Sequence, residues 1–178
     1  MKQTLIYITC FLLIACGNSK SELETIIDDA FISAEKQSLL MAEKYSGQEG
    51  RLPRTYENEK DVSSDSRWWC SGFFPGSLWY IYENTRKPQT LAYAELYTDR
   101  VEREKFTTDN HDVGFMLYCS FGNGLRLTGN ERYNEVLLTG AKSLATRYKP
   151  SVGLIRSWDH NQEVWQYPGI IDNIMNLE

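Results

Sequence analysis

Two kinds of helical segment alternate along the chain. In the first kind, apolar residues recur every three or four positions and leave a polar face, which is typical of an amphipathic helix. These segments cover residues 22–44, 89–103 and 131–148. The second kind is apolar on nearly every side and covers residues 67–82, 113–127 and a stretch that opens at Ile170. Because a helix that is apolar all round is expected to be buried all round, the pattern predicts an all-α protein with an inner and an outer layer.

The alternation is a form of internal repetition. The turn at Asn84-Thr85 precedes an amphipathic helix that contains tyrosine, and the turn at Thr128-Gly129-Asn130 does the same. Repetition of this length is typical of arrays of αα-hairpins. Two concentric rings satisfy the burial pattern, so we expect an α/α toroid. This chain would supply about the first three hairpins, within a domain that covers residues 22–178.

The length sets a further expectation. A ring of six such hairpins needs about 300 residues or more, whereas the chain has 178 residues and ends a few positions into the third apolar segment. We therefore expect either a piece of a longer product or a homodimer that closes the ring, and in both cases a large exposed apolar surface.

Two polar stretches separate these helices. Residues 47–66 contain Gly47, Gly50 and Pro53, and residues 149–168 contain Trp158 and Trp165. Both are expected to be loops, because no stretch alternates clearly as a β-strand. The first is long for a loop, so part of it is expected to line or cover another feature.

Composition and charge narrow the function. A hydrophobic content of 42% and an aromatic content of 13% are typical of a globular protein. The net charge is −5 and no run of lysine and arginine is present, which argues against nucleic acid as a partner. A small acidic ligand in a pocket is still compatible with this charge.

The N-terminus resembles a targeting segment. Lys2 is followed by an apolar stretch, residues 5–15, that is too short to span a bilayer, and Cys16 follows directly. This order is typical of a bacterial lipoprotein signal peptide, residues 1–16, whose Cys16 becomes lipidated; an ordinary signal peptide or a short membrane anchor are the alternatives. Residues 17–21 would form a tether. We expect a lipid-anchored protein of the bacterial cell envelope, at the outer membrane or in the periplasm, that contacts the membrane only through its anchor.

The remaining cysteines indicate no metal site. Cys10 lies in the signal segment, and Cys70 and Cys119 have neither Cys-x-x-Cys spacing nor a histidine at ligand spacing. The two could form a disulfide if their backbones lie close together, but two buried free thiols are the favoured interpretation.

Candidate chemistry gathers where the apolar segments begin. The first begins near Trp69, the second at Asp112, directly after His111, and the third at Asp172. In a ring of hairpins all inner helices run the same way, so their N-termini meet at one end. We therefore expect Trp69, His111, Asp112 and Asp172 to line one pocket.

Two carboxylates with aromatic walls are typical of a carbohydrate-processing site. Two acids in a pocket of low dielectric constant cannot both ionise easily, so one of them can hold a proton for donation. The alternatives are plain: each Asp could be a helix N-cap, and Trp69, Trp158 and Trp165 could pack in the core. His160 is expected to be a polar turn residue.

Several motifs carry a resemblance to a known family. They are Trp69-x-x-Gly72-Phe73-Phe74-x-Gly76, His111-Asp112-Val113-Gly114-Phe115, Arg126-Leu127-Thr128-Gly129, Ile155-Arg156-Ser157-Trp158 and Ile170-Ile171-Asp172-Asn173-x-Met175-Asn176. In this order and with these gaps, from about residue 68 onward, the chain resembles the unsaturated glucuronyl hydrolases of glycoside hydrolase family 88. The related unsaturated rhamnogalacturonyl hydrolases fit the motifs at 111–112 and 155–158 less well.

The resemblance implies an (α/α)6 toroid of the six-hairpin glycosidase type, and it also implies a reaction. The substrate would be the unsaturated uronyl disaccharide that polysaccharide lyases release, and an acid would protonate C4 of its C4=C5 vinyl ether before water adds at C5. Asp172 would be the proton donor and water activator, with Asp112 as its partner carboxylate. His111, Trp69 and Trp158 would contact the substrate, and no metal or organic cofactor is implied.

Two readings from other classes remain open. A glycan-binding helical lipoprotein would use the aromatic residues without chemistry, but it does not explain two aspartates at the starts of successive inner helices. A purely structural repeat scaffold would not need the tryptophans.

Overall fold

The computed structural model describes residues 20–177. The chain divides into two compact units, Met1–Ser33 and Ala34–Glu178. Helix α2 (Glu22–Ser46) begins in the first unit, close to the predicted start and end. Ser21 caps it through a reciprocal pair of hydrogen bonds. The Ser21 hydroxyl accepts from the backbone N–H of Glu24 at 3.2 Å, and the Glu24 carboxylate accepts from the backbone N–H of Ser21 at 2.7 Å. The predicted signal peptide, Cys16 and most of the tether lie outside the described residues.

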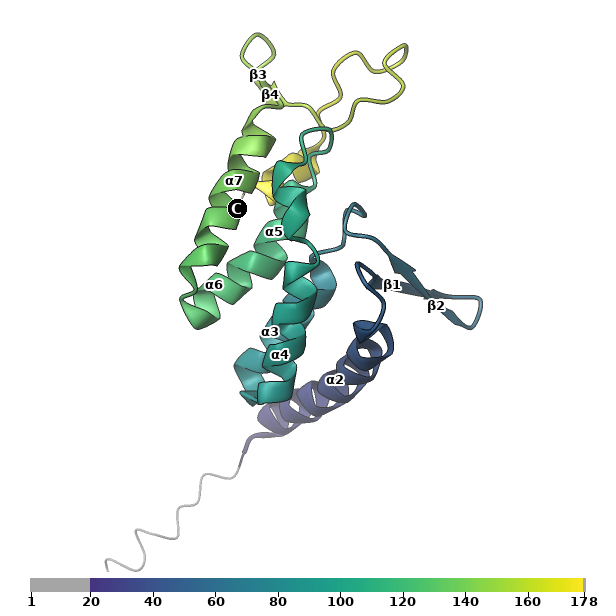
Figure 1. The fold of residues 1–178 in the computed structure, drawn as a ribbon, viewed down its shortest axis with the longest axis vertical. Coiled ribbons are helices and arrows are strands. Elements are labelled where there is room, and N and C mark those ends of the chain that lie inside the picture. The colour runs from purple at the N-terminus through teal and green to yellow at the C-terminus, as the bar shows by residue number, and fades with distance from the viewer. Residues whose placement is uncertain (1–19, 178) are drawn as a thin grey trace, which may run out of the picture. The chain divides into compact units, whose positions relative to one another are not determined.

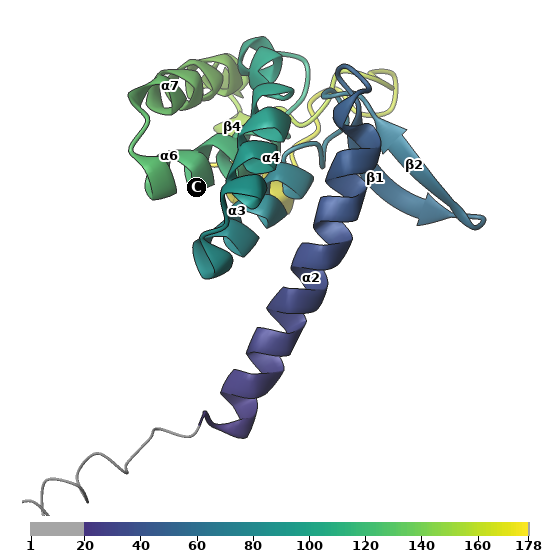
Figure 2. The ribbon, with the colours of Figure 1, turned by 60° about the horizontal axis from the view of Figure 1, so that its bottom comes forward.

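Part of the stretch 47–66 is a β-hairpin, so the prediction of a loop was wrong there. Strand β1 (Leu52–Glu57) pairs antiparallel with β2 (Lys60–Ser64), as Figure 2 shows. Asn58 and Glu59 form the turn with φ angles of 50° and 60°. In a sequence, such two-residue turns are usually recognised by Asn-Gly or Asp-Gly between alternating apolar residues. Here the glycine is missing and only Leu52 of β1 is buried, which is why the pattern gave no strand signal.

A second short hairpin, β3 (Tyr148–Lys149) with β4 (Leu154–Ile155), opens the connection that was expected to be a plain loop. Its turn contains Gly153, whose φ of +75° suits glycine. The hairpin leads the chain back from the end of α7 toward the residues around Ser157.

The helices follow the predicted pairs. Helices α3 (Phe73–Thr85) and α4 (Pro88–Asp99) form the first pair after α2, joined by a short turn in which Arg86 has a φ of 55°. Helix α4 ends earlier than predicted, and a 3₁₀ turn η1 (Glu102–Phe106) follows. The second pair lies beside the first in Figure 1. It consists of α5 (Val113–Leu117), the π turn η2 (Tyr118–Gly122), α6 (Asn123–Thr128) and α7 (Glu131–Ala145).

The predicted apolar helix 113–127 is thus one helical path with a π turn in its middle. Asn130 caps α7 by accepting a hydrogen bond from the backbone N–H of Arg132 at 3.1 Å. The predicted third apolar segment is present as the 3₁₀ helix η3 (Ile171–Asn176).

A core of apolar side chains joins these helices. Trp79 is fully buried in it and donates a hydrogen bond from its indole nitrogen to the Thr98 hydroxyl at 2.9 Å. The expectation that the apolar helices are buried on all sides was wrong, because Tyr80 of α3 and Tyr118 of η2 are each 55% exposed. The guanidinium of Arg126 lies 5.9 Å from the centroid of the Tyr80 ring. Large apolar side chains are also exposed in η3 and its flanks: Ile171, Ile174, Met175 and Leu177.

Two further expectations concern single features. Cys70 and Cys119 are free thiols, as favoured, although both are only half-buried. Among the described helices, none combines the length and the apolar character that crossing a membrane requires.

Candidate functional site

The starts of two predicted inner helices meet at one buried histidine. Asp112 stands directly before α5, and Asp172 lies in the first turn of η3. The Nε2 atom of His111 lies 3.4 Å from Oδ1 of Asp112 and 3.7 Å from Oδ2 of Asp172. The predicted convergence of His111, Asp112 and Asp172 is therefore present in the fold. We call these three residues the acid–imidazole cluster.

Asp112 does not cap its helix. It occupies the N-cap position of α5, but its side chain makes no capping hydrogen bond. The first-turn N–H of Phe115 is instead satisfied by Oδ1 of Asn176, at 2.8 Å, from the end of η3. The alternative that Asp112 is only a helix N-cap is therefore excluded, and its carboxylate faces His111.

Glycines allow the helix starts to approach closely. A Cβ atom added to Gly114 would lie 2.2 Å from the backbone oxygen of Asn176, and one added to Gly72 would lie 2.2 Å from that of Met116. Neither backbone oxygen can give way as a flexible side chain could. These two glycines therefore allow the start of α3 to approach Met116 of α5, and α5 to pack closely on η3. Helix η3 is the yellow helical segment near the C-terminus in Figure 1.

The connection between α7 and η3 holds His111 in place. The backbone N–H of His111 donates to the backbone oxygen of Ser157 at 3.2 Å, and Nδ1 of its ring lies 2.5 Å from Oδ1 of Asn173. The side-chain amide of Asn173 donates to the backbone oxygen of Ile155 at 2.9 Å. Only 5% of His111 is exposed, so its ring has little freedom to reorient.

A buried arginine ties the same two loops together. Arg147 donates to the backbone oxygen of Thr108 at 2.5 Å and to that of Arg156 at 2.6 Å, and it pairs with the Asp159 carboxylate at 3.0 Å. The guanidinium side chain is only 4% exposed. This arginine therefore fixes the loop before His111 against the segment that carries Ser157.

The two carboxylates have unequal surroundings. Burial raises the pKa of Asp112, the imidazole of His111 opposes that rise, and the Asp172 carboxylate adds to it. One oxygen of Asp172, Oδ1, is buried and has no hydrogen-bond partner in the described chain. The cluster thus contains an acid that burial drives toward its protonated form, which agrees with the expectation that one carboxyl can hold a proton.

The predicted aromatic contacts are placed as follows. Trp69 is 43% exposed and packs edge-to-face on Phe73 and Phe115, with ring centroids 5.5 and 6.1 Å apart. Trp158 is half-buried and stacks on His160, with the ring centroids 5.5 Å apart; His160 itself is exposed at a bend. A core role does not fit Trp69 or Trp165, which is 54% exposed. The assignment of Trp69, His111 and Trp158 to substrate contact stays a prediction.

The cluster also satisfies the minimum geometry for a cation. His111, Asp112 and Asp172 each offer one ligand atom, and these atoms lie within 4.8 Å of one another. The same distances fit groups that share a proton, and the sequence predicts no metal.

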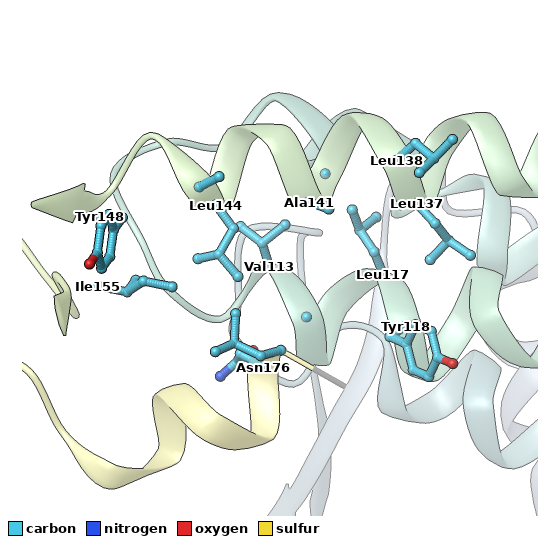
Figure 3. A pocket seen from close by; sticks show the side chains of 14 residues that line it. Val113, Leu117, Tyr118, Leu137, Leu138, Ala141, Leu144, Tyr148, Ile155 and Asn176 are labelled. Carbon is cyan, nitrogen blue, oxygen red and sulfur yellow. The ribbon is translucent and has the colours of Figure 1, made fainter. Parts of the chain in front are cut away.

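An apolar cavity lies elsewhere. It has a volume of about 520 Å³ and runs between α5 and α7. Figure 3 shows Val113 and Leu117 facing Leu137, Ala141 and Leu144 across it, with Asn176 at one edge. No charged side chain lines the cavity, so it does not suit acid chemistry or a charged ligand.

Sequence reasoning missed the residues that orient the cluster: Asn173, Asn176, Ser157 and Arg147. A signal existed in the spacing Asp172, Asn173, Asn176, which places amide side chains one and four positions after an aspartate within an apolar helical stretch. Amides in such a stretch need partners when buried. Their partners, however, could be identified only in the folded chain.

Helical hairpins whose inner helices start around two carboxylates and an imidazole define a partial α/α toroid. Comparison with known proteins finds relatives and solved structures similar to the chain. A relative from Formosa agariphila named unsaturated glucuronyl hydrolase is 48% identical over 114 residues, which cover 64% of this chain and 28% of the relative. An unsaturated chondroitin disaccharide hydrolase from Streptococcus agalactiae is 28% identical over 165 residues, which cover 90% of this chain and 41% of the relative.

Solved structures agree. An unsaturated glucuronyl hydrolase specific for heparin aligns with a TM-score of 0.72 at 38% identity, over 84% of this chain and 40% of that one. The enzyme from Bacillus sp. GL1 aligns with a TM-score of 0.70 at 25% identity, over 82% and 40%. No family model matches the chain. The chain is a homologue of the unsaturated glucuronyl hydrolases, as its motifs indicate, and it spans 28% to 41% of the length of these relatives.

Proposed function

We propose that this chain forms part of a glycoside hydrolase that acts on unsaturated uronyl disaccharides of the glycosaminoglycan type. The observation that carries the proposal is the acid–imidazole cluster, in which two carboxylates from different helices lie within 3.7 Å of one imidazole nitrogen. The names of the relatives, which are glucuronyl and chondroitin disaccharide hydrolases, favour this substrate class over rhamnogalacturonyl disaccharides.

The chemistry asks for an acid and a water site. The C4=C5 double bond of the substrate is conjugated with the ring oxygen, so a proton delivered to C4 places positive charge at C5 and on that oxygen. Water then adds at C5 and returns its proton to the site, and the hydrated ring opens and releases the neighbouring sugar. The site therefore needs one group that gives and takes back a proton, beside a second group that tunes it.

The cluster can supply both roles. Asp172 is 36% exposed at its side chain, whereas that of Asp112 is 14% exposed. The more accessible Asp172 is the better candidate to reach a sugar ring and exchange a proton with it. The less exposed Asp112 would act as the partner carboxylate, and Trp69, which is 43% exposed, offers an aromatic surface for a sugar.

A test separates hydrolysis from mere glycan binding. Asp172→Asn keeps the shape of the side chain but removes the acid. For the full-length protein we expect the loss of double-bond ultraviolet absorbance from a lyase-generated disaccharide to slow by at least about 100-fold, which is the low end of acid–base contributions, while the disaccharide still binds. Asp109→Asn is the matched control, because Asp109 is 58% exposed and pairs only with Arg67 in the described chain. If the unmodified protein and Asp172→Asn bind the disaccharide equally well and the unmodified protein does not turn it over, the result would favour a glycan-binding lipoprotein.

We further propose that Cys16 carries a lipid and anchors the protein in the cell envelope. The support is the order of residues 1–16, with Lys2, an apolar stretch and then cysteine. Mass spectrometry of the mature protein should find a diacylated N-terminal Cys16, and Cys16→Ser should release the protein from the membrane fraction. An unmodified thiol at Cys16 in membrane-bound protein would contradict the proposal.

The active form is proposed to contain a complete ring, either in a longer product or in a homodimer. The basis is the span of the relatives, of which this chain covers less than half. The chain up to Glu178 has a mass of 20.6 kDa before any signal peptide is removed. A native chain well above this mass indicates a longer product, and a mass in solution twice the intact mass indicates a homodimer. A monomer no larger than 20.6 kDa with full activity would contradict both.

A further inference from the structure

We propose that Asn173 is a positioning residue that fixes His111 in the tautomer with its proton on Nδ1, so that the acid–imidazole cluster must hold one shared proton at its centre. The catalytic meaning of that proton rests on the proposed function. The tautomer itself does not, and it can be measured without any substrate.

The hydrogen-bond partners of Asn173 fix the orientation of its side-chain amide. One end of this amide lies 2.9 Å from the backbone oxygen of Ile155 and 3.2 Å from the hydroxyl of Ser157. A carbonyl oxygen can only accept, so the atom that faces Ile155 has to be the amide nitrogen. Turning the amide over would place two carbonyl oxygens against each other in a part-buried site. The amide oxygen therefore faces the ring of His111.

That orientation decides the protonation state of the His111 ring. The amide oxygen of Asn173 can only accept, and it lies 2.5 Å from Nδ1 of His111. That ring nitrogen must therefore carry a proton and donate it. In a neutral imidazole the other nitrogen, Nε2, then has no proton.

The number of protons shared by His111, Asp112 and Asp172 follows from the atoms that face one another. The Nε2 atom faces Oδ1 of Asp112 at 3.4 Å and Oδ2 of Asp172 at 3.7 Å. Without a proton these three atoms would present only lone pairs to one another, beside a histidine that is 5% exposed. Unpaired acceptors are costly where they are buried, as they are at His111 and at Asp112, whose side chain is 14% exposed. One proton among the three atoms, either on Nε2 or on one of the two carboxyl groups, removes this conflict.

Ser157 makes the arrangement rigid. Its hydroxyl oxygen accepts from the Asn173 amide and from the backbone N–H of Ile170 at 3.1 Å, and its backbone oxygen accepts from the backbone N–H of His111. Ser157 is fully buried. The residue that orients Asn173 thus also holds the backbone of the histidine that Asn173 orients.

The shared proton is the one that the proposed hydration needs. In that reaction the proton leaves the cluster for C4, water supplies hydroxide to C5, and the remaining proton of that water refills the cluster, so the count balances after each turnover. Asn173 contacts neither the transferred proton nor the sugar in this scheme. It acts by keeping the Nδ1 proton of His111 out of the exchange.

Nitrogen NMR of the full-length protein labelled with ¹⁵N-histidine tests the tautomer. The chain has two histidines, so a His160→Gln variant assigns the His111 signals directly. Near neutral pH we expect Nδ1 of His111 to be protonated. In Asn173→Ala the ring loses this acceptor, and the proton should move to Nε2, where it can bond to a carboxylate. Asn123→Ala is the control, since Asn123 donates to the backbone oxygen of Cys119 and accepts from Arg126, contacts that do not involve His111, and the variant should leave the His111 signals unchanged.

The outcomes are distinct. A neutral His111 protonated only on Nε2 in the unmodified protein would overturn the proposal, even if Asn173→Ala does not fold. Nδ1 protonation that survives Asn173→Ala would overturn the role of Asn173. If hydrolase activity is present, Asn173→Ala should lower kcat by about 10-fold or more with little change in KM, because the residue orients another group. A confirmed tautomer in a protein without turnover would reject the proposed function and leave the positioning role intact.

Discussion

Asn176 caps helix α5 from a distant part of the chain, because its Oδ1 accepts a hydrogen bond of 2.8 Å from the backbone N–H of Phe115, 61 residues earlier. The cap comes from the end of η3, and its presence leaves Asp112, at the N-cap position of α5, without that task. One amide side chain thereby couples the docking of η3 to the availability of a candidate catalytic carboxylate.

Asn176→Ala should destabilise the fold. The backbone N–H of Phe115 would lose its partner at a site where Asn176 is 4% exposed, and loss of a cap costs about 1 kcal/mol. Urea unfolding measures the change. Asn130→Ala removes the cap of α7 and should cost a similar amount, but only Asn176→Ala should also disturb the His111 signals in NMR. Equal stability of Asn176→Ala and the unmodified protein would contradict the role of this cap.

Gly114→Ala should displace η3 from α5. The added Cβ would lie 2.2 Å from the backbone oxygen of Asn176, and such overpacking costs about 1–3 kcal/mol. The measurement is urea unfolding, supported by amide hydrogen exchange at Phe115, which should accelerate. In Gly47→Ala the new methyl group meets no atom within 4 Å, so this variant should stay near the unmodified stability. The prediction fails if the two variants behave alike.

Folding stability should carry a pH signature of Asp112. Burial raises the pKa of this carboxyl above its ordinary value of 3.8, and so the folded protein binds a proton that the unfolded chain has already lost. Its contribution therefore makes stability fall as pH rises from about 4 through the raised pKa. Asp112→Asn removes the contribution, so the variant should gain stability relative to the unmodified protein as pH rises across this window. Urea unfolding between about pH 4 and pH 8 tests this, with Asp109→Asn as the exposed control; curves for Asp112→Asn that run parallel to the unmodified protein would disprove it.

Cys70 and Cys119 should stay reduced and react slowly. Burial raises the pKa of both thiols above the ordinary value of 9.0, so little reactive thiolate is present at neutral pH. Alkylation followed by peptide mass spectrometry should label both sites far more slowly in the folded protein than in urea. A disulfide-linked peptide that contains both cysteines would contradict the structure.

The spacing of apolar residues along the chain was enough to predict helices α2 and α7. Helix α2 with its Ser21 cap and helix α7 with its Asn130 cap lie close to their expected bounds, because capping and periodicity act within a few residues. The meeting of His111, Asp112 and Asp172 was predictable as well, since helices that run the same way gather their starts. The β1–β2 hairpin was not, because its turn uses Asn58-Glu59 without glycine and its strands bury little.

What the sequence determined by itself is therefore the set of helices, the glycines between them and the identity of the acids. Only the tertiary structure decided how those acids are held. The cap from Asn176, the orientation of Asn173 by Ile155 and Ser157, and the burial that raises the pKa of Asp112 all depend on partners distant in sequence. Hydrogen bonds and desolvation act over a few ångströms in space, so their effect exists only after packing has brought those partners together.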